Sequence, residues 1–259
     1  MKRLFVHIPF RLLGLYLEEA AERGLCLDLL FDAEALDGYR AKELDELRER
    51  IEGKGMAVSL HGPYVDLVPG SPDPRVREVS LERMLQVVEP ARLLRARQVV
   101  LHSGWDPWRW RYDGDRKLWR ERSLEVWERL LRATERAGTL WALENVFEEE
   151  PGPLLEIIER VGSLRLRHCL DLGHFNVFAG CSLEEWLSAL GPFVVAVHLH
   201  DNDGRRDGHL ALGQGNIDWE RTLGAISALP QEVAMILEGG SREAVEGSLS
   251  LMKELALGG

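Results

Sequence analysis

Eight short apolar runs alternate with amphipathic stretches along the whole chain. Each run has the length of a buried strand, and the apolar residues that follow have helical spacing, which is the pattern of repeated βα units. Eight units in 259 residues predict an α/β fold, a (β/α)8 TIM barrel of the usual length of about 250 residues, with a doubly wound open sheet as the alternative. The expected strands are 3–8, 25–30, 56–61, 97–102, 139–144, 165–171, 193–198 and 232–238.

The composition excludes several classes of protein. No apolar run approaches the roughly 18 residues needed to span a bilayer, and the N-terminal segment lacks a signal-peptide cleavage site, so we expect a soluble cytoplasmic protein. Acidic residues outnumber basic ones by 43 to 32, which disfavours the broad cationic surface of nucleic-acid binding proteins. Cys26, Cys169 and Cys181 are too few and too far apart to predict a disulfide framework or a thiolate zinc site.

Histidines and acidic residues end six successive expected strands. In TIM barrels the active site lies at the C-terminal ends of the strands, so these side chains should meet at one mouth. Imidazoles and carboxylates without thiolates favour zinc, manganese, cobalt or magnesium, and the sequence therefore predicts a divalent metal site. The six residues are His61, His102, Glu144, Asp171, His198 and Glu238.

Two loop motifs add further candidate ligands. His174 lies three residues after Asp171 in DLGHF, and Asp207 and His209 are spaced to lie on one side of an extended segment. Nine candidates are more than one ion can use, so we expect one to three divalent ions. The nine are His61, His102, Glu144, Asp171, His174, His198, Asp207, His209 and Glu238, whereas His7, His168 and His200 are expected to be structural.

An aromatic loop, GWDPWRWRYDGD at 104–115, follows the fourth expected strand. As a lid over the mouth, it would stack Trp105 or Trp108 on a sugar ring or base while Arg109 and Arg111 hold phosphate. As a packing loop, it would bury the same rings against neighbouring elements. The sequence leaves both interpretations open.

In several blocks the chain resembles the xylose isomerase-like TIM barrels, the superfamily of sugar isomerases and epimerases that also contains endonuclease IV. The resemblance covers nearly the whole chain and implies one such barrel domain over residues 1–259. The similar blocks are HGPYVDL at 61–67, GSPDPRVREVSLER at 70–83, VLHSG at 100–104, ALENV at 142–146, DLGHF at 171–175, HLHDNDG at 198–204 and DGHLALGQGNIDW at 207–219.

The sugar isomerase and epimerase branch implies a single metal held by residues matching Glu144, Asp171, His198 and Glu238. The resemblance then implies that Glu144 and Glu238 accept and donate protons from opposite sides of a sugar or sugar phosphate, and that His174 contacts it. Under this hypothesis Tyr64, Trp105, Trp108 and Arg109 are the expected substrate-binding residues.

Endonuclease IV implies a different use of the same residues. Endonuclease IV has a trinuclear zinc site, and each of its nine ligands has a matching position in this chain, namely one of the nine candidates. Tyr64 also matches a tyrosine that endonuclease IV places against DNA. The acidic FDAEALDGY at 31–39 replaces the basic loop expected there, so the multi-metal phosphodiesterase, with DNA as its partner, is the alternative. A non-catalytic sugar-binding barrel would require a damaged ligand set.

Overall fold

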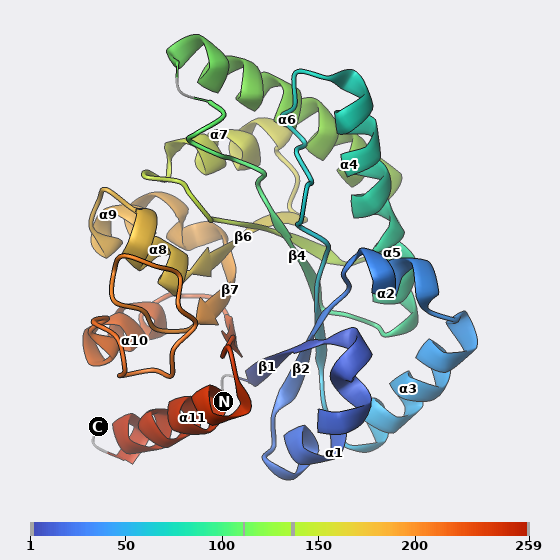
Figure 1. Ribbon diagram of the computed structural model, residues 1–259, viewed down its shortest axis with the longest axis vertical. Helices are drawn as coiled ribbons and strands as arrows, with labels where there is room; N and C mark the ends of the chain where they lie inside the picture. Colours follow the sequence, from blue (N-terminus) through green and yellow to red (C-terminus); the bar gives the residue numbers. More distant parts are fainter. Residues whose placement is uncertain (1–2, 111, 136–137, 258–259) are drawn as a thin grey trace.

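Eight parallel strands close into a barrel in the chain order β1 to β8, in a computed structural model that describes residues 3–110, 112–135 and 138–257 (Figure 1). The expected TIM barrel is confirmed, and each observed strand overlaps its expected one. The strands are β1 Leu4–Pro9, β2 Cys26–Leu30, β3 Val58–His61, β4 Gln98–His102, β5 Leu140–Glu144, β6 Leu166–Asp171, β7 Val194–Leu199 and β8 Ala234–Leu237.

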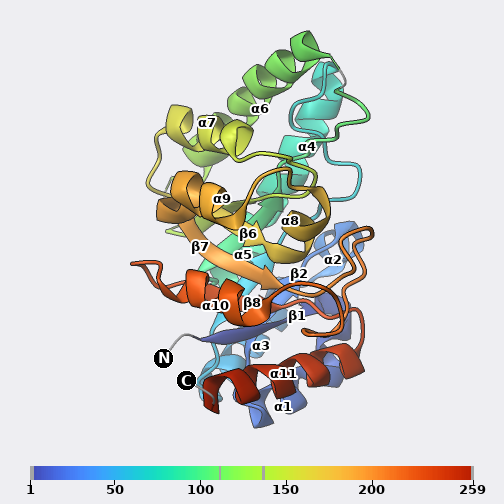
Figure 2. The same ribbon diagram turned by 90° about the vertical axis from the view of Figure 1, so that its left-hand side faces the viewer.

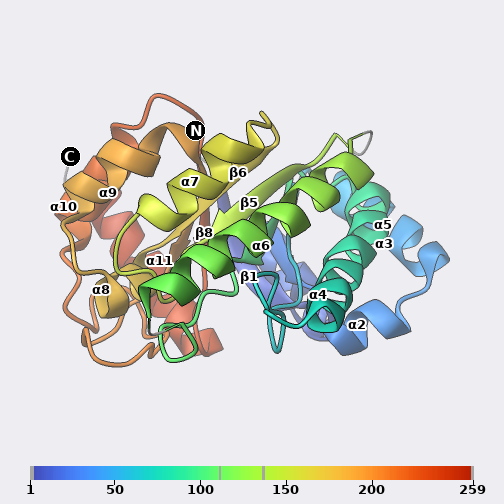
Figure 3. The same cartoon turned by 90° about the horizontal axis from the view of Figure 1, so that it is seen from above.

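The helices lie outside the strands and cover the outer face of the barrel (Figure 3). Because both faces of each strand are therefore covered, the strands read as continuous apolar runs. The helices are α1 Leu13–Glu22, α2 Ala33–Gly38, α3 Ala41–Gly53, α4 Pro74–Gln86, α5 Val88–Leu93, α6 Asp113–Ala133, α7 Gly152–Val161, α8 Leu172–Phe178, α9 Leu183–Leu190, α10 Trp219–Ser227 and α11 Arg242–Leu257, with short 3-10 helices at Phe10–Leu12 and Gly191–Phe193.

The apolar side chains form two separate clusters. The larger one fills the space between strands and helices and contains the fully buried Trp127, Trp141 and Trp186. The smaller one lies inside the barrel and forms a floor of mostly small side chains. Its members are Phe5, Cys26, Val100, Ala142, Cys169, Ala196 and Ile236.

The loops that follow the strands are fixed by local hydrogen bonds. The Asp171 carboxylate ends β6 and caps α8, where its Oδ1 accepts from the His174 backbone N–H at 2.6 Å. That cap holds two candidate ligands at one helix start. Within the described part of the chain, no helix combines the length and apolar character needed to cross a membrane.

Candidate metal centre

A ring of ionisable side chains lies one level above the apolar floor of the barrel. Successive side chains of a strand point to opposite faces, so the residue two positions after each floor residue also points inward, nearer the mouth. On β3, where Ser59 takes the floor position, the same step leads to His61. All eight positions are ionisable: His7, Asp28, His61, His102, Glu144, Asp171, His198 and Glu238.

His198 lies at the centre of three carboxylates. Its Nδ1 is 3.0 Å from Glu238 Oε2, 3.4 Å from Asp171 Oδ2 and 3.5 Å from Glu144 Oε1. Burial would lower the pKa of His198, but the surrounding anionic groups raise it well above its usual range. Among the described residues, neither ring nitrogen of this buried imidazole has a hydrogen-bond partner.

Three other histidines share one orientation. The Nδ1–H groups of His61, His174 and His209 each donate to a backbone carbonyl, those of Gly62, Asn145 and Glu238, at 2.8 to 3.0 Å. A carbonyl accepts only, so each Nδ1 carries a proton. Burial would lower the pKa of all three rings, but the neighbouring carboxylates raise it, so each Nε2 also holds a proton that a metal ion would have to displace. Metal-binding histidines are fixed in this way, with one nitrogen anchored and the other available.

The available Nε2 atoms face carboxylates. His61 Nε2 is 3.1 Å from Glu144 Oε2, and His102 Nε2 is 3.5 Å from the same oxygen. Burial lowers the pKa of His102 to about 4, which keeps this ring neutral, as a ligand must be. His174 Nε2 and His209 Nε2 lie 3.3 and 3.1 Å from Asp207 Oδ2.

Asp201 holds the loop that carries Asp207 and His209. Its buried carboxylate accepts hydrogen bonds from Trp219 Nε1 and the Gly213 N–H, both at 2.8 Å, and its backbone pairs with Leu210. The loop, orange in Figure 1, is thereby folded back beside α8. Asp201 therefore explains how the segment returns to the mouth, where His209 Nδ1 contacts the Glu238 carbonyl.

Among the described residues, three sets of potential ligands together contain all nine candidates, and two further groups overlap them: Glu144 with Cys169 and His198, and Glu144 with Asp171 and His174. Within each set the ligand atoms lie within 4.8 Å of one another, a spacing that one cation could bridge. The sets are His61, His102 and Glu144; Asp171, His198 and Glu238; and His174, His200, Asp207 and His209. All nine residues predicted from the sequence are therefore brought together.

These groups fit a divalent cation. Burial would raise the pKa values of Glu144, Asp171 and Glu238, but the adjacent histidines lower all three, so the carboxylates are ionised. The same carboxylates raise the pKa of His198, so in the absence of a metal its imidazolium is the cation among them, and a divalent ion would take the place of that proton. The Glu238 Oε2 atom, like the His198 ring, is buried without a hydrogen-bond partner among the described residues.

His200 was expected to be structural but lies within the third set. It is fully buried, its Nε2 is 3.1 Å from both Asp171 oxygens, and its ring stacks on that of His209 at 3.9 Å. The signal in the sequence was its i, i+2 spacing from His198, which places both on the inner face. His168, by contrast, donates to the Leu143 carbonyl and accepts from Trp186 Nε1, a structural role as expected.

His7 and Asp28 complete the ring on the first two strands. They face each other in the β1–β2 register, His7 Nδ1 lies 2.8 Å from Asp28 Oδ2, and His7 Nε2 lies 3.8 Å from Glu238 Oε1. Neither was singled out from the sequence as a site residue because β1 and β2 continue past them. Each lies two positions after a residue of the apolar floor, Phe5 or Cys26, so the alternation is visible once the inward-facing residues of these strands are known.

The expected substrate-binding residues lie in different environments. Tyr64 is 43% exposed and stacks on His102 at 4.6 Å, and Trp108 is 61% exposed and meets Phe147 edge to face. Trp105 instead is buried against Trp119, so this ring packs into the fold and does not form part of a lid. Arg109 pairs with Asp106 at 3.2 Å, and Arg111 is outside the described residues.

Comparisons with known proteins agree with this architecture. A sequence model of a family described as "Xylose isomerase-like TIM barrel" matches residues 17–255. Uncharacterized protein MJ1311 of Methanocaldococcus jannaschii is 32% identical over 222 residues, which cover 82% of this chain and 73% of that protein.

Two solved structures superpose over nearly the whole chain. A D-tagatose 3-epimerase-like protein has 26% identity and a TM-score of 0.85, covering 99% of this chain and 97% of its own. The TTHB071 protein from Thermus thermophilus, in a crystal soaked with ZnCl2, has 27% identity and a TM-score of 0.83, with coverage of 99% and 98%.

Proposed function

The chain belongs to the xylose isomerase-like TIM barrel family, and from this premise we propose that it is a divalent-metal-dependent isomerase or epimerase of a small sugar or sugar phosphate. One observation carries the proposal. Glu144, Asp171 and Glu238 surround His198 Nδ1 within 3.5 Å, and these four are the residues that a single-metal sugar isomerase of this family would use. The similarity to a D-tagatose 3-epimerase-like protein supports the same class of reaction.

The chain's own groups then account for proton transfer. Glu144 and Glu238 approach His198 from two different strands, and both are ionised, so either can accept the proton from the carbon next to a substrate carbonyl. The other carboxylate, once it has taken up a proton, returns one to the opposite face of that carbon. His174, at the same edge of the mouth, would contact the substrate.

The residues around His198 would hold a divalent zinc, manganese, cobalt or magnesium ion. When bound, such an ion supplies Lewis-acid polarisation of a carbonyl and its neighbouring hydroxyl. Because further ligand sets lie beside this one, we propose a total of one to three ions per chain. Zinc is one candidate because the similar TTHB071 crystal was soaked with ZnCl2.

The test begins with metal content and a ketose panel. Protein purified without chelator is analysed by elemental mass spectrometry, and each metal-loaded form is then incubated with ketoses and ketose phosphates while product stereochemistry is followed. Glu238→Gln keeps the shape of the side chain but removes its basicity, so turnover should fall by at least about 10²-fold. Leu164→Gln, at a side chain that is 80% exposed, is the matched control. No turnover of any sugar by any loaded form would overturn the proposal.

A second function is favoured by the additional ligands. A one-metal isomerase does not need His61 and His102, which lie beside Glu144, as metal ligands, and it does not need the set at Asp207. Three neighbouring sets are the arrangement expected of a multi-metal phosphodiester hydrolase such as endonuclease IV. Two or three zinc ions per chain together with cleavage of abasic DNA would establish this alternative, whereas a single ion with ketose turnover would exclude it.

A further inference from the structure

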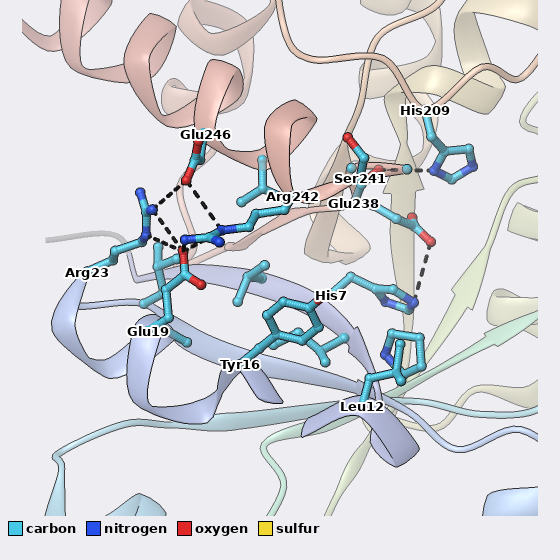
Figure 4. Close-up of a pocket in the computed structure, with 18 residues that line it drawn as sticks. His7, Leu12, Tyr16, Glu19, Arg23, His209, Glu238, Ser241, Arg242 and Glu246 are labelled. Atoms are coloured by element: carbon cyan, nitrogen blue, oxygen red, sulfur yellow. Dashed lines mark hydrogen bonds and ion pairs between the residues drawn. The ribbon is translucent and has the colours of Figure 1, made fainter. Parts of the chain in front are cut away.

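A cavity of about 320 Å³ opens beside the metal centre and extends between the first and last helices. His209 and Glu238 line its inner end, and α1 and α11 form its sides (Figure 4). Figure 2 shows these two helices on the same side of the barrel. The volume lies at the lower end of the range for small-molecule pockets, about 300–1,000 Å³.

Glu238 belongs to both spaces. Its Oε2 faces His198, whereas its Oε1 points toward His7 Nε2 at 3.8 Å, on the side where the cavity begins. A molecule whose reacting atoms lie at His198 would therefore pass this carboxylate before its remaining atoms enter the cavity. The cavity is a continuation of the proposed active site.

The middle of the cavity is apolar. The outer face of β1 forms one wall, and Ala20 of α1 and Val245 of α11 contribute apolar surface on the two sides. Tyr16 lies between the two ends in Figure 4. The apolar lining residues are Val6, Ile8, Leu12, Ala20, Leu25 and Val245.

The far end carries charges that already satisfy one another. Arg23 Nη2 is 2.8 Å from both Glu19 Oε1 and Glu246 Oε1, and Arg242 lies 3.1 Å from Glu19 and 3.5 Å from Glu246. Two cations and two anions leave no excess positive charge to attract a phosphate or carboxylate. A free sugar, in turn, would leave the apolar walls uncovered.

We propose that this cavity receives an apolar substituent, alkyl or aryl, of a substrate whose sugar-like head lies at the metal centre. The inference rests on the proposed function and narrows it to sugars that carry an apolar group. Under this inference, the cavity walls formed by α1 and α11 select the substrate. The residues that carry out the reaction remain those named under the proposed function.

The test compares two probes that differ only in tail length. Calorimetric titration of the metal-loaded protein with hexyl β-D-glucoside and with methyl β-D-glucoside should give a Kd lower by at least about tenfold for the hexyl compound, because five added methylenes leave water. Ala20→Leu and Val245→Phe each fill the cavity from a different helix and should abolish that preference. Leu15→Phe, on the exposed face of α1, should retain it.

The outcomes separate this inference from the proposed function. Equal affinity for the two probes, no hexyl binding at millimolar concentration, or a preference that survives in both filled variants would overturn the inference, even if unsubstituted ketoses are turned over. A hexyl preference lost in either folded variant supports it. In that case, the absence of ketose turnover would count against the proposed reaction alone.

Discussion

His198 and Glu238 lie with Nδ1 3.0 Å from Oε2, yet neither atom has a hydrogen-bond partner among the described residues. A cation would satisfy both atoms and would relieve the repulsion among the buried carboxylates. We therefore expect chelation to lower the Tm by more than about 5 °C, and readdition of the ion to restore it. Calorimetry of the loaded, chelated and reloaded protein measures these changes in Tm. If the chelator removes the metal and the Tm stays the same, the prediction is wrong.

The two histidines on Glu144 distinguish the candidate mechanisms. In a one-metal isomerase, His61→Ala and His102→Ala remove only neighbours of a ligand, so kcat/KM should fall by about 10- to 100-fold. In a multi-metal hydrolase each change removes a ligand, and both metal content and activity should be lost. Elemental analysis of the folded variants, with circular dichroism as the check on folding, decides between them.

Asp201 should matter through the loop that it anchors. Asp201→Asn weakens its bonds to Trp219 and Gly213 within a buried site, so the free energy of unfolding should fall by about 2–3 kcal/mol. The ion bound nearest Asp207 should also be held less tightly. Urea unfolding and metal titration measure the two effects, and Asp203→Asn, at an exposed position in the same loop, should have a smaller effect on both.

The barrel could be predicted because its signal is local. Each strand is an apolar run that can be counted in the sequence, and His61, His102, Glu144 and Asp171 end their strands as expected. β2 also ends as expected, at Leu30, whereas three strand ends differ by one residue: β1 continues to Pro9, β7 continues to Leu199, and β8 stops at Leu237. A strand end that moves by one residue does not change which side chains of that strand point into the barrel.

Other features of the site depend on contacts between distant segments, even where a local spacing, such as that of His200 from His198, points to the position. His200 joins the third ligand set only because the loop from 201 folds back, and that fold depends on a hydrogen bond to Trp219, 18 residues later. Trp105 was expected at the mouth, but its burial is decided by Trp119 on the next helix. The cavity between α1 and α11 reflects space left between distant segments, which side-chain periodicity does not predict.

Glu148 should make stability depend on pH. Burial raises the pKa of Glu148 to about 7, although the hydrogen bonds that its carboxylate accepts from Ser103 and the Val146 N–H lower the pKa in part. Since the folded pKa exceeds the unfolded value of about 4.3, its contribution is fully present below that value and is lost as pH rises through 7, by roughly 3 kcal/mol. Urea unfolding from pH 4 to 8 should show this fall in the wild type relative to Glu148→Gln, while the exposed Glu149→Gln behaves as wild type. Parallel pH profiles for the wild type and Glu148→Gln would refute the raised pKa.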